Sequence, residues 1–131
     1  MEDNFKIDII SPEKIIFSDE IKAVKVPSYE GDMNLLKNHI SIISFLRPGI
    51  VQIAKKDGSS EFFFVEDGIA EFFNNTLVLL SATVKSIKDI SKDFLDTLKK
   101  NTEKEIKKEN TSDQDLYVLN HKLDVIKNIK I

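Results

Sequence analysis

The sequence predicts an α+β chain: an N-terminal antiparallel β-sandwich over residues 1–85, followed by a C-terminal antiparallel α-helical hairpin over residues 86–131. The first two thirds of the chain consist of short segments rich in Ile, Val and Phe, the residues that favour pleated strands. Turn residues separate these segments about every 8–12 residues, which is typical of sandwiches and barrels. Beyond residue 85, Lys, Asp and Glu dominate and apolar residues recur at helical spacing.

The strands can be assigned in order from the apolar pattern. The first alternates Phe and Ile with Lys6 and Asp8, the period of two expected of a half-buried strand. A short apolar stretch follows at residues 15–17, and another strand is expected over residues 21–26, ended by Pro27. Five further strands are expected, at residues 40–46, 50–55, 61–65, 69–73 and 76–82.

The segments between the strands contain specific turn signals. No strand is expected between Pro27 and residue 40, and His39 is expected to lie in a loop before the next strand. Arg47-Pro48-Gly49 has the residue order that a type II turn uses. Asp57-Gly58 is a hairpin signal, and Asn74-Asn75 tolerates the left-handed backbone of a tight turn.

Two of the predicted strands are apolar on both faces. In residues 40–46, Ile42 and Leu46 fall on one face while Ile43 and Phe45 fall on the other. Residues 61–65 likewise place apolar side chains on both faces. Either the helical hairpin covers the outer face, or that face docks on another protein. We favour the docking interpretation, because two short helices are a small cover for so many strands.

The C-terminal part predicts two amphipathic helices joined by a polar break at residues 110–113. Ser86 and Ser91 are rival N-caps for the first helix, which extends over residues 92–109. Its apolar stripe is thin, with Thr102 where a hydrophobic residue is expected, so the arm should be weakly held. The apolar seam of the second helix consists of Leu116, Leu119, Leu123 and Ile126.

The composition offers no catalytic constellation. Cysteine is absent, which excludes thiol catalysis and zinc–thiolate sites, and the glycines are too dispersed for a phosphate-binding loop. The two histidines, His39 and His121, lack partners at metal-ligand spacing, and His121 is expected to be simply solvated. We therefore expect neither a cofactor nor a metal. Because the N-terminus lacks a signal-peptide pattern and the longest apolar runs are four residues, we expect a cytoplasmic chain that meets a membrane only through a partner.

The net charge of −3 is unevenly distributed. Residues 1–84 carry 8 Lys and Arg against 13 Asp and Glu, whereas residues 85–131 carry 11 against 9. An acidic body argues against nucleic acid as a partner, which would need a basic patch on the folded part. The mildly basic arm is suited to an acidic protein surface, although ordinary solvated surfaces would give the same balance.

Three motifs follow one another in the sequence: Glu30-Gly31-Asp32, then His39, then the stretch Leu46-Arg47-Pro48-Gly49-Ile50-Val51. In this order and spacing they resemble the epsilon-subunit family of F-type ATP synthases, and the resemblance covers roughly residues 4–84. Asn34 and Lys37-Asn38 stand where the family has Gly and Pro-Gly. Asn tolerates a positive φ, so we expect the same local backbone.

The resemblance implies a non-catalytic rotor subunit of the central stalk, which couples c-ring rotation to ATP synthesis on the cytoplasmic face of a bacterial inner membrane. By position, it places Glu30, Gly31, Asp32 and His39 in a loop that faces the c-ring. It places the strand residues Ile42, Ile43, Phe45 and Leu46 against the gamma subunit. The helical arm of the family can extend toward the catalytic alpha/beta hexamer and inhibit ATP hydrolysis.

Some members of the family bind ATP through an Ile/Leu-Asp-x-x-Arg-Ala motif at the start of the first helix. Here Ser91 replaces the acid and Phe94 replaces the arginine, so ATP binding by that route is not expected. A β-sandwich module that binds a carbohydrate or small molecule is the alternative function. The absence of tryptophan and the presence of only two tyrosines argue against it.

Overall fold

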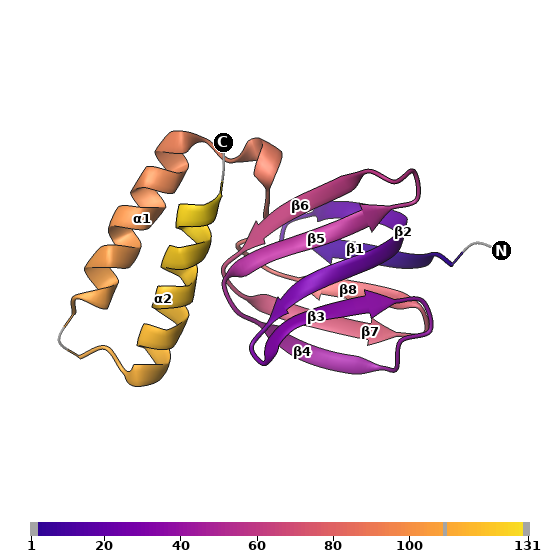
Figure 1. Ribbon diagram of the computed structural model, residues 1–131, viewed down its shortest axis with the longest axis horizontal. Helices are drawn as coiled ribbons and strands as arrows, with labels where there is room; N and C mark the ends of the chain where they lie inside the picture. Colours follow the sequence, from indigo (N-terminus) through magenta and orange to yellow (C-terminus); the bar gives the residue numbers. More distant parts are fainter. Residues whose placement is uncertain (1–2, 109, 130–131) are drawn as a thin grey trace.

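The computed structural model describes residues 3–108 and 110–129; Glu109, at the end of the first predicted helix, lies outside these ranges. The chain forms a β-sandwich with a helical hairpin beside it (Figure 1). The strands are β1 (Phe5–Ile10), β2 (Ile15–Ser28), β3 (Gly31–Leu36), β4 (Ile42–Leu46), β5 (Gly49–Lys55), β6 (Ser60–Val65), β7 (Gly68–Phe73), β8 (Thr76–Leu80) and β9 (Lys85–Ser86). A 3₁₀ turn, η1 (Ile87–Asp89), then leads to helices α1 (Lys92–Ile106) and α2 (Asp113–Asn128).

The strands pair in the order β1-β8-β7-β4-β2-β5-β6-β9, with β3 added on β2. β1 also pairs with β2, so the long β2 belongs to both layers of the sandwich. The predicted antiparallel sandwich followed by two helices is confirmed, with one exception: β1 and β8 are parallel. A parallel pair needs a long connection, and here most of the sandwich lies between the two strands.

β2 is longer than the sequence predicts. The expected breaks at residues 18–20 and at Pro27 do not occur, and β2 continues for 14 residues. Pro27 is the penultimate residue of β2, where a missing N–H matters least, and its carbonyl still accepts from the Arg47 N–H at 2.9 Å. A register shift against β5 between Ile21 and Ala23 lets the same strand turn from one layer to the other.

β3 occupies most of the stretch between Pro27 and residue 40, where the sequence predicts no strand. Met33 and Leu35 face the core and alternate with the exposed Asp32 and Asn34, a period of two that the sequence already carried. Asn38, in the connection to β4, has φ 68°, as expected of an asparagine in the place of glycine. Asn34, by contrast, is an ordinary strand residue.

The turn signals are confirmed in two of three cases. Asn74 and Asn75 have φ 48° and 56° and connect β7 to β8. The hydroxyl and the backbone N–H of Ser59 donate to Asp57 in the β5–β6 turn, and these hydrogen bonds lower the pKa of the Asp57 carboxyl. The type II turn at Gly49 is wrong, because Gly49 is the first residue of β5 and has no positive φ. It is small for a different reason: a Cβ there would lie 2.4 Å from Cβ of Pro27.

Alternate residues of β6 are buried in two separate apolar clusters. Phe63 and Val65 lie in the sandwich core, packed with residues from most of the strands. Phe64 points to the other face and is 0% exposed, because the hairpin covers it. The hairpin cluster around Phe64 consists of Ile90, Leu95 and Ile126, with Ile50, Ile87, Phe94, Leu98, Val125 and Ile129 partly buried against it.

Of the two rival N-caps predicted for the first helix, Ser91 is the one that caps it, and Ser86 caps the preceding 3₁₀ turn. Ser86 caps η1 by accepting from the Lys88 N–H, and Ser91 caps α1 by accepting from the Phe94 N–H at 3.0 Å. Ser112 caps α2 in the same way. Thr102, the apparent gap in the stripe of α1, is 1% exposed, and its hydroxyl donates to the Leu98 carbonyl at 2.7 Å. Its methyl group can therefore pack in the hairpin while no polar atom is left unpaired.

We predict that Gly49→Ala destabilises the sandwich by about 1–3 kcal/mol, because the new methyl group must displace Pro27. Urea unfolding followed by far-UV circular dichroism would measure the loss. Ala82→Ser, an exposed change in the loop after β8, is the control and should leave the midpoint unchanged. An unchanged midpoint for the Gly49 variant would mean that the contact with Pro27 is not a constraint.

We predict that truncating two neighbouring residues of β6 has different consequences. Phe63→Ala should lower the free energy of unfolding of the sandwich by about 3–5 kcal/mol. Phe64→Ala should instead loosen residues 90–129 while the sandwich stays folded, since its side chain packs mainly under the hairpin. Limited proteolysis with mass spectrometry would distinguish the two outcomes, and equal protection of the hairpin in both variants would contradict the assignment.

Candidate functional site

An apolar face remains uncovered on the outer side of β4, β7 and β8. Ile43 and Phe45 of β4 point outward and are 67% and 64% exposed. Phe45 pairs with Ile69, and Ile69 pairs with Leu80, so the exposed side chains form a row across the three strands. We call Ile43, Phe45, Ile69, Leu80 and the half-buried Ile10 the open face.

The four residues predicted to dock on gamma do not all belong to the open face. Ile42 is half-buried and packs against the sandwich core, and Leu46 is 1% exposed within it. Strand alternation turns them inward, whereas Ile43 and Phe45 turn outward. Only Ile43 and Phe45 are therefore available to a partner.

Sequence reasoning missed three members of the open face. Ile10, Ile69 and Leu80 lie on strands assigned correctly, but their shared direction depends on the pairing register, which one strand alone does not reveal. A shallow hollow runs along these residues between β1, β4, β7 and β8. An exposed row of large apolar side chains across several strands is suited to protein contact.

The four residues assigned to a c-ring loop lie at two ends of β3. Glu30 lies in the β2–β3 turn, Gly31, with φ 125°, is the first residue of β3, and Asp32 follows it. His39 lies beyond the far end of this six-residue strand, roughly 20 Å away by strand geometry. Its ring packs edge-on against Phe72, and its Nδ1 lies 2.7 Å from the Ile40 carbonyl. These four residues therefore do not lie in the single loop that the sequence predicts.

Arg47, in the β4–β5 turn, connects the β2–β3 turn to α2. Its Nη2 lies 3.3 Å from Asp32 Oδ1, and its Nε donates to the Ser28 carbonyl at 2.9 Å. Its Nη1 lies 3.1 Å from Nδ1 of His121. The prediction that His121 is simply solvated is wrong: the ring is half-buried, contacts Arg47, and stacks edge-on with Tyr117.

The start of α1 is built for packing. Phe94, which occupies the position of the family's arginine, lies in the hairpin cluster with the Lys85 ammonium group 4.9 Å from its ring centroid. Ser91, which occupies the position of the acid, is the α1 N-cap. Phe94 thus helps to hold α1 on the sandwich, and Ser91 stabilises the start of the helix.

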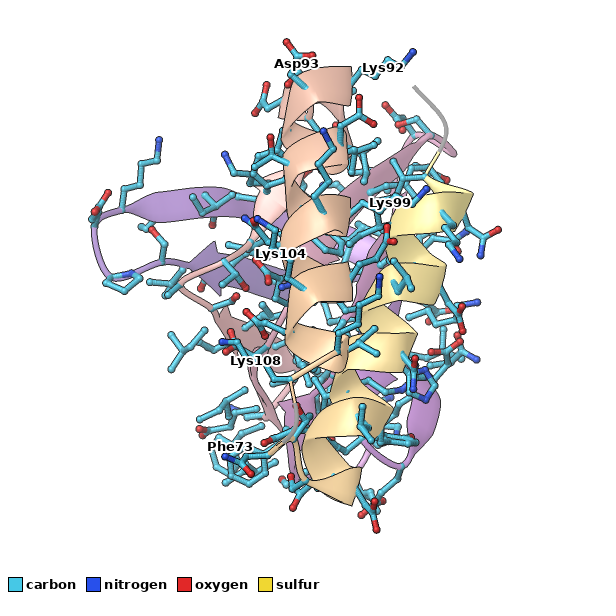
Figure 2. All side chains as sticks on the ribbon, turned by 90° about the vertical axis from the view of Figure 1, so that its left-hand side faces the viewer. Phe73, Lys92, Asp93, Lys99, Lys104 and Lys108 are labelled. Atoms are coloured by element: carbon cyan, nitrogen blue, oxygen red, sulfur yellow. The ribbon has the colours of Figure 1, made fainter. Side chains whose placement is uncertain are left out.

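The outer side of α1 carries a solvent-exposed set of charges. Figure 2 shows the side chains of Lys92, Lys99 and Lys104 projecting from α1, with Asp93 at its first turn and Lys108 just beyond its end. All five are exposed. This surface lies on the side of the hairpin away from the sandwich, where it remains available to a partner (Figures 1 and 2).

Residues 3–108 and 110–129 contain neither a metal-binding cluster nor a helix suited to span a membrane. No three His, Cys, Asp or Glu side chains gather there in a way that could hold a metal ion. No helix in these ranges is both long and apolar enough to cross a bilayer. The surfaces described above are the open face, the β2–β3 turn and the hairpin.

The sequence matches a known protein family and several of its members. Residues 4–87 match the family described as ATP synthase, Delta/Epsilon chain, beta-sandwich domain. The ATP synthase epsilon chain of Pelagibacter ubique is 45% identical over 130 residues, covering 98% of this chain and 99% of that one. The epsilon chain of Dichelobacter nodosus is 30% identical over 107 residues, 82% of this chain and 75% of its own length.

Solved structures share the fold at low sequence identity. A chain of the Euglena gracilis mitochondrial ATP synthase, solved as OSCP/F1/c-ring, has a TM-score of 0.74 at 13% identity, with 97% of this chain and 79% of that one covered. A chain of the Tetrahymena thermophila mitochondrial ATP synthase central stalk and c-ring has a TM-score of 0.62 at 12% identity, with coverage of 93% and 92%. By its sequence match over most of the chain, and with a fold in agreement, this protein belongs to the delta/epsilon chain family of ATP synthase.

Proposed function

We propose that this chain is the epsilon subunit of an F-type ATP synthase, a non-catalytic part of the central stalk that couples c-ring rotation to ATP synthesis. The observation that carries the proposal is the 45% identity to an epsilon chain over nearly the full length of both proteins. The alternative of a carbohydrate-binding module has no such support. Catalysis in this machine belongs to other subunits.

The open face is the proposed contact with gamma. It presents Ile43, Phe45, Ile69 and Leu80 from three paired strands, so the backbone that displays them is rigid. Burying such a row contributes about 25 cal/mol per Å² of apolar surface, without a cost for ordering loops. This supports a contact that stays in place while the rotor turns.

The β2–β3 turn is the proposed contact with the c-ring. Glu30 and Asp32 are exposed and acidic, and Asp32 is held by Arg47 and, at 3.9 Å, by Lys25. His39 lies beyond the other end of β3 and therefore does not share a loop with Glu30, Gly31 and Asp32. We therefore restrict the proposed c-ring contact to Glu30, Gly31 and Asp32.

The hairpin is the proposed regulatory arm. Its exposed lysines, among them Lys92, Lys99 and Lys104, suit an acidic surface such as the one that the arm of this family meets on the alpha/beta hexamer. The chain would then work on the cytoplasmic face of the bacterial inner membrane, held there through the complex rather than by a segment of its own.

We predict that Phe45→Glu weakens binding to gamma roughly thirtyfold, which corresponds to about 2 kcal/mol, because it places a charge within the open face. Binding of purified variants to immobilised gamma would measure the effect. Leu36→Glu is the matched control, since Leu36 is also exposed but lies on β3, outside the open face. Equal loss in both variants, or no affinity of the parent for gamma, would contradict the proposal.

We predict that a chain ending at Asp89 raises ATP hydrolysis by the assembled complex, because the inhibitory helices are gone. This end point keeps Val84 in the sandwich core and β9 paired with β6, which an end point at Thr83 would remove. ATP hydrolysis would be compared between complexes that carry the full chain and complexes that carry the shortened chain, with the same fraction of gamma subunits bound in each. Unchanged hydrolysis at full occupancy would show that the hairpin is only structural.

A further inference from the structure

Two polar contacts join α2 to the sandwich, in addition to the apolar cluster. Lys122 forms an ion pair with Glu66 of the β6–β7 turn. One residue earlier on α2, Nδ1 of His121 lies 3.1 Å from Nη1 of Arg47. The first contact pairs opposite charges, but the second joins a permanent cation to a group that can become one.

Contacts within the sandwich alone hold the guanidinium group of Arg47 in place. Its side chain is 15% exposed, and it donates to the Ser28 carbonyl and to the Asp32 carboxylate. Its own backbone N–H donates to the Pro27 carbonyl at 2.9 Å. These partners all belong to the β2–β3 region, so the sandwich presents Nη1 toward α2 in a constant position.

The chemistry of the pair fixes the state of the imidazole. An arginine donates and cannot accept, so at 3.1 Å Nδ1 of His121 must accept with its lone pair. Only the neutral ring has that lone pair. A ring that takes up a second proton would instead direct an N–H, and a positive charge, at a fixed cation.

We propose that Arg47 and His121 form a protonation-sensitive latch, which holds the hairpin on the sandwich while the ring is neutral and releases it when the ring becomes charged. The inference goes beyond the proposed function, because it concerns the chain itself whether or not the arm inhibits hydrolysis. Histidine is the side chain that changes charge near physiological pH.

Other groups around His121 modify this balance without replacing it. Asp32 lies behind Arg47 and is shared with Lys25, while Asp124, one turn further along α2, lines the same hollow but is exposed. Both carboxylates are negative, whereas the guanidinium group of Arg47, in direct contact with the ring, is positive. The remaining neighbours are Tyr117, the Lys122–Glu66 pair, and the apolar Ile50 and Phe62 that line the hollow with His121.

The sign of the effect follows from linkage. The docked hairpin uses the lone pair of the neutral ring, whereas the released hairpin accepts either form, so docking weakens as pH falls and the ring takes up a proton. Because one proton is involved, the docking equilibrium constant changes by at most about tenfold per pH unit.

The test measures the distance between hairpin and sandwich in the isolated full chain. The protein has no cysteine, so Lys22→Cys on β2 and Lys104→Cys on α1 accept one spin label each. Double electron–electron resonance at pH 7.5, 6.5 and 5.5 should show the docked distance giving way to longer ones. His121→Gln, which keeps an acceptor for Arg47 but does not titrate, should stay docked at all three values.

His39→Gln is the matched control and should respond to pH as the parent does, because His39 lies away from the hairpin. The series is repeated with Leu95→Val, which weakens the hairpin cluster and brings docked and released populations closer together. A response to pH that persists in His121→Gln would overturn the latch. So would unchanged distances in both the parent and the Leu95 background.

Discussion

Phe63 and Phe64 are neighbours on β6, point to opposite faces of the sheet, and are both almost inaccessible to water. A strand that is apolar on both faces needs a cover on each side. The sandwich interior covers Phe63, and residues more than twenty positions later in the chain cover Phe64. The position of the hairpin follows from this requirement: it lies where β5 and β6 would otherwise expose apolar surface, while β4, β7 and β8 keep theirs open.

Most of the fold could be predicted from local patterns, because alternation and helical spacing depend on residues close in sequence. The strands around Phe45, Phe64 and Ile69 and both helices follow from those patterns. The sequence does not predict β3 although Met33 and Leu35 alternate with Asp32 and Asn34, because its glycine, aspartate and asparagine resemble a turn. Gly49 shows the opposite error: a turn signal in sequence marks a close approach of two strands in space.

The candidate surfaces were less predictable, because they depend on register and on contacts between distant residues. Leu46 and Phe45 are adjacent in sequence, yet one is core and the other is surface. The row through Ile69 and Leu80 exists only because three strands pair at those positions. The contact of His121 with Arg47 joins residues 74 positions apart, and no local pattern contains it.

The two apolar surfaces of the sandwich differ in a way that bears on movement. The open face is displayed by paired strands and needs no rearrangement to meet a partner. The covered face is closed by helices whose inner side is narrow, and Thr102 contributes only a methyl group where a longer chain would bury more. The cover therefore relies on Arg47, His121, Lys122 and Glu66 as well as on burial. Polar contacts between charged groups depend on charge state and on ionic strength, whereas apolar burial does not depend on charge state. A cover held partly by charges can thus be exchanged without unfolding the sandwich, which is the physical requirement for an arm with two positions.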